Sequence, residues 1–366
     1  MILTVVFYIF ILFAGIQVSY YLLFSNILFS KKKNIRLPDF PISVIIFAKN
    51  NAENLRNFLP SILTQKYKNF EVVLIDNNST DRTQKVINSF AKIHSNIHIV
   101  NVENNEAFWG SKKYAMTLGI KVAKYEHLLF TEANSRPISE HWISEMSMEF
   151  SNEKTIVLGY SSFEKQKNIA NFLIRFYHFL TAIQFLNFTK LGIPFMADGK
   201  NLAYKKEDFY RAKGFINHMK QDLGEDDLFI QDASNEINTT YCISKNSFVE
   251  TANFSTLSDW FFLQRKKFFL RKKYKSKHRF LLSLFTFSKL FFYVFGIVLF
   301  FFYPYKIILS FMLGYFLVQY IIVGISAKRL DEKNLIYFLP FLDISFLLIQ
   351  MSIFMANLTS KPPHWK

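Results

Sequence analysis

Long apolar segments stand at both ends of the chain, and shorter apolar runs alternate with polar segments between them. The first long segment, 2–29, contains no charged residue, and three more occupy about 281–303, 307–325 and 335–355. Each is close to the roughly 20 residues that a helix needs to cross a bilayer. We therefore expect one N-terminal and three C-terminal transmembrane helices. Lys289 interrupts the second segment, and we expect its ammonium to extend to the head groups.

The region between these segments has a different pattern. Strands are predicted at 42–47, 70–75, 97–100 and 127–130, and helices at 50–65, 83–93 and 111–124. Strands that alternate with helices form βαβ units, which give an α/β fold with a mainly parallel sheet. Ligands bind beyond the carboxyl ends of such strands. Polar segments at 48–50, 76–77 and 132–134 all fall there, so we expect a site at this edge.

The segment 169–188 is also rich in Phe, Leu and Ile. Arg175, His178 and Gln184 interrupt it and leave no run that we expect to be long enough to span a membrane. The pattern favours an interfacial amphipathic helix or a core helix.

Positive charge decides the expected orientation. The formal net charge is +16, and lysines and arginines cluster at 31–36, 265–279 and 328–333, beside the apolar segments. Basic flanks stay in the cytoplasm under the positive-inside rule. We therefore expect a multi-pass protein of the cell (inner) membrane, with its N-terminus outside and residues 31–280 cytoplasmic. These clusters would bind anionic membrane lipids, and their position disfavours nucleic-acid binding. The single cysteine, Cys242, excludes an intrachain disulfide.

Seven short motifs follow one another between residues 41 and 268. They are AKNNAENL at 48–55, IDNNSTDRT at 75–83, GSKKYA at 110–115, FTEANSRP at 130–137, GKNLAY at 199–204, GEDDL at 224–228 and QRKKF at 264–268. In this order they resemble the motifs of family 2 glycosyltransferases. The resemblance implies an A-type glycosyltransferase fold over 38–270. The apolar segments add an expected anchor at 1–29 and a bundle of three transmembrane helices at 281–357.

The resemblance implies a nucleotide-sugar donor of the UDP or GDP type. Asp76 would accept a hydrogen bond from the base, and its alternative role is an Asx turn. Lys112, at a helix start, would hold phosphate, and Asp81 would cap a helix. Gln264, Arg265 and Lys267 would form a lid over the diphosphate. The remaining substrate-binding residues implied by the resemblance are Ala48, Asn50, Glu53, Asn134, Gly199 and Asn201.

The family's Asp-x-Asp metal motif reads Glu132-Ala133-Asn134 here. The paired acids of the family hold Mg²⁺ or Mn²⁺, which offsets the charge of the leaving diphosphate. One negative charge is missing, so we expect weaker metal affinity. Three alternatives stay open. Glu132 and the diphosphate hold the metal, cations such as Lys112 and Arg265 replace it in part, or the protein does not catalyse.

Three adjacent acids, Glu225, Asp226 and Asp227, resemble the family's base motif. An attacking acceptor hydroxyl needs a carboxylate that takes its proton. The resemblance assigns this role to Asp226, with Asp227 as the alternative. Glu225 would orient the acceptor or help raise the pKa of the base through its like charge. The resemblance also implies inversion at the anomeric carbon.

We therefore expect an inverting glycosyltransferase of cell-envelope polysaccharide or glycolipid synthesis. Its acceptor would be a lipid-linked or other membrane-proximal glycan at the cytoplasmic face. One alternative is a processive polysaccharide synthase, for which Gln319 and Asp343 would be the main polar pore-lining residues. Another is a non-catalytic, nucleotide-binding membrane scaffold. Loops at 101–109 and 187–198 would select the sugar, base and acceptor, which the sequence does not name.

Overall fold

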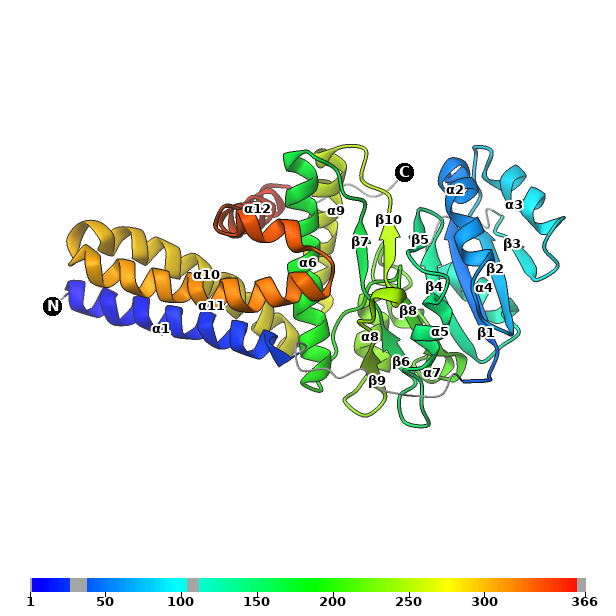
Figure 1. The fold of residues 1–366 in the computed structure, drawn as a ribbon, viewed down its shortest axis with the longest axis horizontal. Helices are drawn as coiled ribbons and strands as arrows, with labels where there is room; N and C mark the ends of the chain where they lie inside the picture. The colour runs from blue at the N-terminus through cyan, green and yellow to red at the C-terminus, as the bar shows by residue number, and fades with distance from the viewer. Residues whose placement is uncertain (1, 27–37, 104–111, 361–366) are drawn as a thin grey trace. The chain divides into compact units, whose positions relative to one another are not determined.

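The computed structural model describes residues 2–26, 38–103 and 112–360 (Figure 1). The chain divides into two compact units. Of the described residues, a helical unit takes 2–26, 166–187 and 257–360, and an α/β unit takes the others. The basic cluster at 31–36, the loop residues 104–109 and the expected helix start at 111 lie outside the described residues.

The α/β unit is built on a seven-stranded sheet with the strand order β3-β2-β1-β4-β8-β6-β9. β1 is parallel to β2 and β4, β2 is parallel to β3, and β6 is parallel to β9. β8 runs antiparallel to β4 and β6. The four expected strands and the mainly parallel sheet are therefore confirmed. The strands are β1 (Ile42–Ala48), β2 (Phe70–Asp76), β3 (Ile97–Asn101), β4 (His127–Glu132), β6 (Ile156–Leu158), β8 (Leu202–Lys205) and β9 (Thr239–Tyr241).

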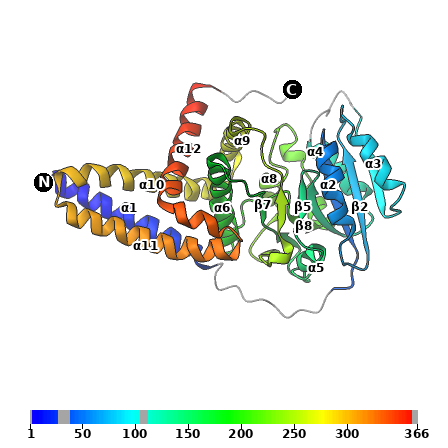
Figure 2. The ribbon, with the colours of Figure 1, turned by 45° about the horizontal axis from the view of Figure 1, so that its top comes forward.

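The three expected helices of this region are confirmed, and they pack on both faces of the sheet (Figure 2). Val44 and Ile46 of β1 share a core with α2 (Ala52–Leu63) and α3 (Thr83–Ala91). Successive side chains of a strand point to opposite faces, so Ile45 faces α4 (Lys112–Val122). A Cβ at Gly119 of α4 would lie 2.3 Å from Ile75 Cδ1 and 3.6 Å from Ile45 Cγ2. Glycine thus lets α4 lie close to the sheet, with Lys112 at the carboxyl edge.

A second sheet of three strands and several short helices complete this unit. The order of the second sheet is β5-β10-β7, with β10 antiparallel to β5 and parallel to β7. These elements are β5 (Ser135–Pro137), α5 (Trp142–Ser147), β7 (Ser161–Phe163), α7 (Lys206–Arg211), η2 (Ile216–His218), α8 (Asp227–Ala233), η3 (Lys245–Ser247) and β10 (Val249–Thr251).

Asn201, in the turn before β8, is a buried junction of this unit. Its Nδ2 donates to the carbonyls of Tyr160 and Ser247, both at 2.8 Å, and its Oδ1 accepts from Trp142 Nε1 at 3.0 Å. The side chain is fully buried. A Cβ at Gly159 would lie 2.3 Å from Asn201 Cγ, so this position needs glycine. Asn201 therefore holds loops together, and the substrate contact expected of it stays a prediction that these buried partners do not support.

The helical unit consists mainly of long helices, and short connections join only those from α9 to α12. It contains α1 (Ile2–Phe24), most of α6 (Ile169–Lys190), α9 (Leu257–Leu270), η4 (Arg271–Lys273), α10 (Ser276–Phe302), α11 (Tyr305–Arg329), η5 (Lys333–Phe338) and α12 (Leu339–Thr359).

Five helices within the described residues are long and apolar enough to cross a membrane. Four of them are the expected segments, and the fifth is α6. The expectation that 169–188 holds no sufficiently long run is therefore wrong. The reason lies in Arg175, which pairs with Glu332 so that both side chains are buried. The Arg175 guanidinium also donates to Asn334 Oδ1 at 2.8 Å. Its charge is thus matched inside the helical unit.

A buried ion pair joins α10 to α12. Lys289 Nζ contacts Asp343 Oδ1, and both side chains are fully buried. Hydroxyls of Tyr293 and Tyr315 donate to Asp343 Oδ2 at 2.7 and 3.1 Å, and Lys289 donates to Tyr21 OH at 3.1 Å. These residues come from α1, α10, α11 and α12, so one polar cluster links four helices. Our expectation that Lys289 extends to the head groups is wrong, because Asp343 pairs with it inside the bundle.

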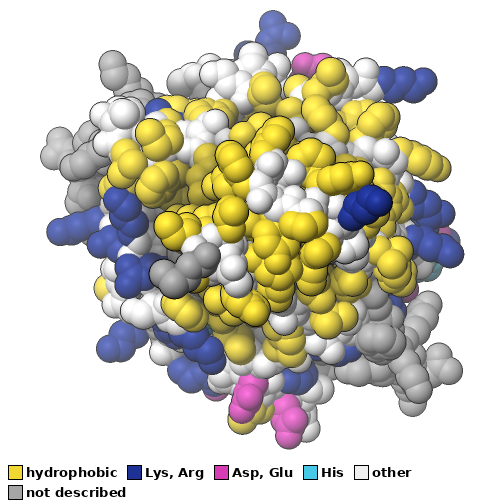
Figure 3. All heavy atoms as spheres, turned by 90° about the vertical axis from the view of Figure 1, so that its left-hand side faces the viewer, with side chains coloured by type: hydrophobic (Ala, Val, Ile, Leu, Met, Phe, Trp, Pro, Cys, Tyr) yellow, Lys and Arg dark blue, Asp and Glu magenta, His cyan; other side chains and the backbone are white. Residues whose placement is uncertain are grey.

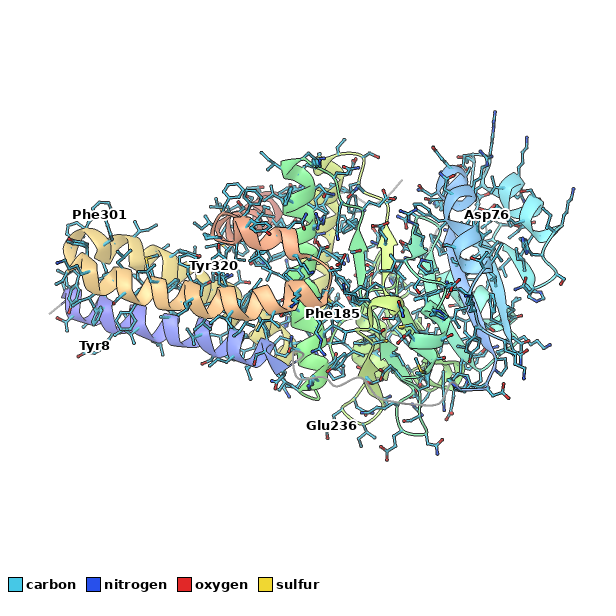
Figure 4. The ribbon with its side chains drawn as sticks, viewed as in Figure 1. Tyr8, Asp76, Phe185, Glu236, Phe301 and Tyr320 are labelled. Atoms are coloured by element: carbon cyan, nitrogen blue, oxygen red, sulfur yellow. The ribbon has the colours of Figure 1, made fainter. Side chains whose placement is uncertain are left out.

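Apolar side chains cover the outside of this bundle. Tyr8 of α1 is 66% exposed and Phe301 of α10 is 73% exposed, and both lie on the outer surface of their helices (Figure 4). Hydrophobic side chains also gather on the face that Figure 3 shows. Paired charges inside and apolar side chains outside are typical of a helix bundle in a membrane. The orientation across that membrane stays a prediction.

Replacing Asp343 by Leu should destabilise the bundle strongly. The change leaves the Lys289 ammonium buried without its carboxylate, which costs about 3–5 kcal/mol. The double variant Lys289→Met/Asp343→Leu should recover most of this loss, because it removes both charges. Thermal unfolding of the full chain in detergent measures the effect, with exposed Lys306→Met as a control. A single Asp343→Leu variant as stable as the wild type would contradict this account.

Replacing Asn201 by Ala should lower the melting temperature of the full chain. Three buried partners lose their hydrogen bonds, and one unpaired buried group costs about 1–3 kcal/mol. Circular dichroism during heating checks the result. Asn246→Ala is the matched control, since Asn246 is exposed. Equal melting temperatures for the two variants would show that the Asn201 junction is dispensable.

Candidate active site

A small cavity lies at the carboxyl edge of the large sheet in the α/β unit. Its volume is about 20 Å³, which is enough for about one water molecule. The polar residues of its wall come from β4, the start of α4, the turn before β8 and the loop before α8. The wall consists of Phe47, Lys112, Met116, Phe130, Thr131, Glu132, Gly199, Leu202, Tyr204, Phe215, Glu225 and Asp226.

The ammonium of Lys112 lies between two carboxylates of this cavity. Lys112 Nζ contacts Glu132 Oε1 and lies 2.7 Å from Glu225 Oε1. It also lies 5.2 Å from the centre of the Phe47 ring, a cation–π contact. Glu132 closes β4, whereas Glu225 precedes α8, so the lysine connects segments about 90 residues apart in the chain. The motifs at 130–137 and 224–228 therefore meet at Lys112, which belongs to the motif at 110–115.

Burial and charge oppose each other at this lysine. Burial alone lowers the pKa of Lys112, but Glu132 and Glu225 outweigh it and raise the pKa well above its usual range. Burial alone raises the pKa of Glu225, but Lys112 outweighs it and lowers that pKa to about 2. The pKa of Glu132 is likewise lowered, because Lys112 and then Lys200 outweigh burial. All three groups are therefore charged at neutral pH.

Lys113, which the sequence did not single out, positions the acidic loop. Its buried Nζ donates to the carbonyls of Gln221 and Leu223 at 2.6 and 2.7 Å. Burial lowers its pKa. Gly224 follows with a φ of 101°, a value that favours glycine. The Lys113 anchor and this glycine turn Glu225 toward Lys112. The sequence does contain a signal for this role. Two adjacent lysines at a helix start face different directions, so they are expected to bind different partners.

Asp226 is the N-cap residue of α8, and it lines the cavity. Its Oδ1 accepts from the backbone N–H of Asp227 at 2.8 Å, and its Oδ2 accepts from Gly199 N at 3.3 Å. Asp227 is buried, only 2% exposed, and is not part of the cavity wall. Of the two aspartates considered as a base, Asp226 alone contacts the cavity. Gly199 therefore meets the acidic motif here, while its expected substrate contact stays a prediction.

The turns after β1 and β2 interlock on the nucleotide side of the expected site. Asp76 ends β2 (Figure 4) and its Oδ1 accepts from Ser79 N and Oγ at 3.2 and 2.5 Å. Its Oδ2 has no hydrogen bond to any residue that the structure describes. Asn50, with φ 52°, accepts from Thr80 N at 2.8 Å. Asp76 thus forms the Asx turn through Oδ1, and its contact with a base stays a prediction.

This side of the site also contains two expected substrate contacts, Ala48 and Glu53, and one expected helix cap, Asp81. Ala48 is buried, and its carbonyl accepts from Asn77 N at 3.0 Å. Glu53 is exposed on the first turn of α2. Asp81 accepts from Thr83 N at 2.9 Å and from Ala52 N at 3.2 Å, at the starts of α3 and α2. These hydrogen bonds outweigh burial and lower the pKa of Asp81. They agree with a capping role.

The donor set around Glu132 does not fit a divalent ion. Its carboxylate already pairs with Lys112. Asn134 is neutral, and its Oδ1 accepts from Ser135 Oγ at 3.2 Å. Among the residues that the structure describes, no three His, Cys, Asp or Glu side chains converge as metal ligands. Mg²⁺ and Mn²⁺ prefer several oxygen ligands, carboxylates above all.

The expected lid residues belong to α9 in the helical unit. Arg265 donates to Asn357 Oδ1 at 3.1 Å, to the carbonyl of Ala356 at 2.9 Å, and to Ser360 O and Oγ at 2.7 and 2.9 Å. It therefore binds the carboxyl end of α12, where cations are favoured. Gln264 and Lys267 are partly exposed on the same helix. The diphosphate contact expected of Arg265 is not supported by these partners.

Comparison with known proteins agrees with the motif order. The sequence model described as glycosyl transferase family 2 matches residues 43–211. Glycosyltransferase GlyG of Streptococcus pneumoniae is 29% identical over 93 residues, which cover 25% of this chain and 30% of that protein. Poly-beta-1,6-N-acetyl-D-glucosamine synthase of Staphylococcus epidermidis is 31% identical over 94 residues, 26% of this chain and 22% of that protein.

A third relative has a named lipid-linked acceptor. The Escherichia coli protein UDP-Glc:alpha-D-GlcNAc-diphosphoundecaprenol beta-1,3-glucosyltransferase WfaP is 25% identical over 130 residues, which cover 35% of this chain and 47% of that protein. The chain thus matches less than half the length of each of these three relatives.

A solved structure resembles nearly the whole chain. The mannosyltransferase PcManGT from Pyrobaculum calidifontis, in complex with GDP-Man and Mn²⁺, has a TM-score of 0.58 at 14% identity, over 95% of this chain and 99% of that one. Likeness at this identity shows the fold, and it confirms the expected A-type fold. The chain therefore carries a glycosyl transferase family 2 domain, to which residues 43–211 belong.

Proposed function

We propose that the protein is an inverting glycosyltransferase that moves a sugar from a nucleoside-diphosphate sugar to a membrane-proximal acceptor. The observation that carries the proposal is the position of Asp226, whose carboxylate lines the same cavity as the Lys112–Glu225 pair. In a single displacement, a base takes the proton of the acceptor hydroxyl and a cation stabilises the leaving diphosphate. Both groups line this cavity.

The reaction is a single displacement. An acceptor hydroxyl oxygen attacks the anomeric carbon, and a new C–O bond forms there. The bond from that carbon to the diphosphate oxygen breaks on the opposite side, and its electron pair leaves with the nucleoside diphosphate. Asp226 takes the hydroxyl proton as the new bond forms. One base and one displacement invert the configuration at the anomeric carbon.

The chain's own residues would hold the donor at two points. Asp76 Oδ2 would accept from a base N–H of uracil or guanine, while Ser79 keeps the carboxylate oriented through Oδ1. Lys112 would hold the diphosphate, and the amide N–H groups at the start of α4 favour anions there. The donors named for WfaP and PcManGT, UDP-Glc and GDP-Man, support a donor of this class.

A divalent ion does not fit the residues at the position of the family's metal motif. Glu132 pairs with Lys112 and Asn134 is neutral. The binding and displacement steps above therefore use Asp76, Lys112 and Asp226 only.

The acceptor would be held at the membrane surface. The helical unit has apolar outer faces, and tethering an acceptor to the same bilayer raises its effective concentration. Basic segments beside the helices favour a cytoplasmic α/β unit. The diphosphoundecaprenol acceptor in the name of WfaP supports a lipid-linked glycan.

Processive synthesis through the helical unit has less support. Gln319 and Asp343, the expected pore-lining residues, are both fully buried. Gln319 donates to Tyr21 OH at 2.8 Å, and Asp343 pairs with Lys289. Side chains that link helices in this way do not line a water-filled path.

Replacing Asp226 by Asn should lower sugar transfer by about 10²–10⁴-fold, the usual contribution of a general base. Nucleotide binding should persist, because the change leaves Lys112 and Asp76 in place. The measurement is release of UDP or GDP from a panel of nucleotide-sugars by the full chain in lipid nanodiscs, with a membrane extract as the source of acceptor.

The matched control is Asp232→Asn, which removes an exposed acid at the other end of α8. It should retain wild-type turnover. Turnover by Asp226→Asn at the wild-type rate would contradict the base assignment. Wild-type protein that binds no nucleotide would contradict the transferase proposal itself and the scaffold alternative with it.

A further inference from the structure

We propose that Lys112 serves as the site's resident cation for the diphosphate, so that nucleotide binding by this protein needs no divalent metal ion. The inference rests on the proposed function and specifies how this site would hold its donor. It starts from the Lys112 ammonium, which is placed between Glu132 Oε1 and Glu225 Oε1.

The lysine pairs with Glu132, the one carboxylate that the metal-motif position offers. Two carboxylates from different segments face each other across it, and each contributes one oxygen. A metal ion that used Glu132 would first have to displace this ammonium. Asn134, the second residue of the metal motif, is neutral and would not favour the replacement of the ammonium by a metal ion. Lys112 thus compensates the charges of Glu132 and Glu225 without an ion.

The ammonium keeps a donor for the ligand. A lysine ammonium has three N–H donors, and two go to the glutamates. Among the described residues, no acceptor takes the third, and Lys112 lies on the cavity wall. The glutamates prevent the long side chain from moving freely, so the remaining donor is oriented before the diphosphate arrives. A hydrogen bond from a charged donor to phosphate is among the stronger ones.

A second cation lies near the same acids. Lys200 lowers the pKa of Glu132 through its charge, and its Nζ lies 4.8 Å from the centre of the Phe163 ring. Lys112 and Lys200 together match the charges of Glu132 and Glu225. Asp226 adds a third carboxylate to the same wall, so the two lysines offset part of the negative charge that a diphosphate meets there.

The test measures nucleotide and metal binding and needs no turnover. Isothermal titration of the full chain in nanodiscs with UDP and GDP compares EDTA with Mn²⁺, and Mn²⁺ electron paramagnetic resonance reports metal binding directly. The wild-type dissociation constant of the preferred nucleotide should change less than about twofold between EDTA and Mn²⁺. Lys112→Met should raise the dissociation constant of that nucleotide by about 10–100-fold, because it removes a hydrogen bond to a charged group.

Two further variants sharpen the test. Lys121→Met, at the exposed far end of α4, should bind nucleotide as the wild type does. Lys112→Met combined with Asn134→Asp should bind Mn²⁺ and regain nucleotide affinity only when Mn²⁺ is present, because it exposes carboxylates to the ion. Retained melting behaviour of each variant shows that it is folded.

The outcomes separate this inference from the proposed function. Nucleotide binding that EDTA abolishes and Mn²⁺ restores in the wild type would overturn the resident cation and leave the transferase proposal standing. Binding that Lys112→Met leaves unchanged would also overturn it. A wild type that binds neither nucleotide under either condition would overturn both proposals together.

Discussion

The ammonium of Lys112 connects the parts of the α/β unit that form its candidate site. A carboxylate at the end of β4 and another before α8 would each be costly to bury alone, because a buried charge without a partner loses its hydration. Lys112 compensates both. Its place at the start of α4 depends on Gly119, which lets the helix lie close to the sheet. Lys113, the next residue, orients the acidic loop from the same turn.

The same electrostatic requirement shapes the helical unit. Lys289 and Asp343 are fully buried between α10 and α12, and tyrosine hydroxyls from neighbouring helices complete their hydrogen bonds. Arg175 and Glu332 form a second pair of this kind. Lipid cannot hydrate a charge, so each polar side chain in such a bundle needs a partner within the protein. Polar residues within the apolar segments therefore mark positions where one helix contacts another.

Much of this structure could be predicted from the sequence, and the failures share a cause. The βαβ strands and helices follow from short apolar runs and helical spacing, which are local patterns. The position of Asp76 and Glu132 at one edge of the sheet could be predicted because β2 and β4 run in the same direction and end there. Lys112 begins the helix α4 at the same edge. Pairing between distant residues is not local, so the roles of Lys289 and Asn201 could not be derived from their neighbours. The partners of Arg265 at the end of α12 could not be derived for the same reason, since they are about 90 residues away.

A structure of the full chain in nanodiscs, determined by electron cryomicroscopy with UDP or GDP in the presence of EDTA, would show which groups hold the diphosphate. We expect a diphosphate oxygen at about 2.7–3.2 Å from Lys112 Nζ, the range of an N–H···O hydrogen bond, with the base beside Asp76. A nucleotide bound away from this cavity, or a diphosphate out of reach of Lys112, would contradict this expectation.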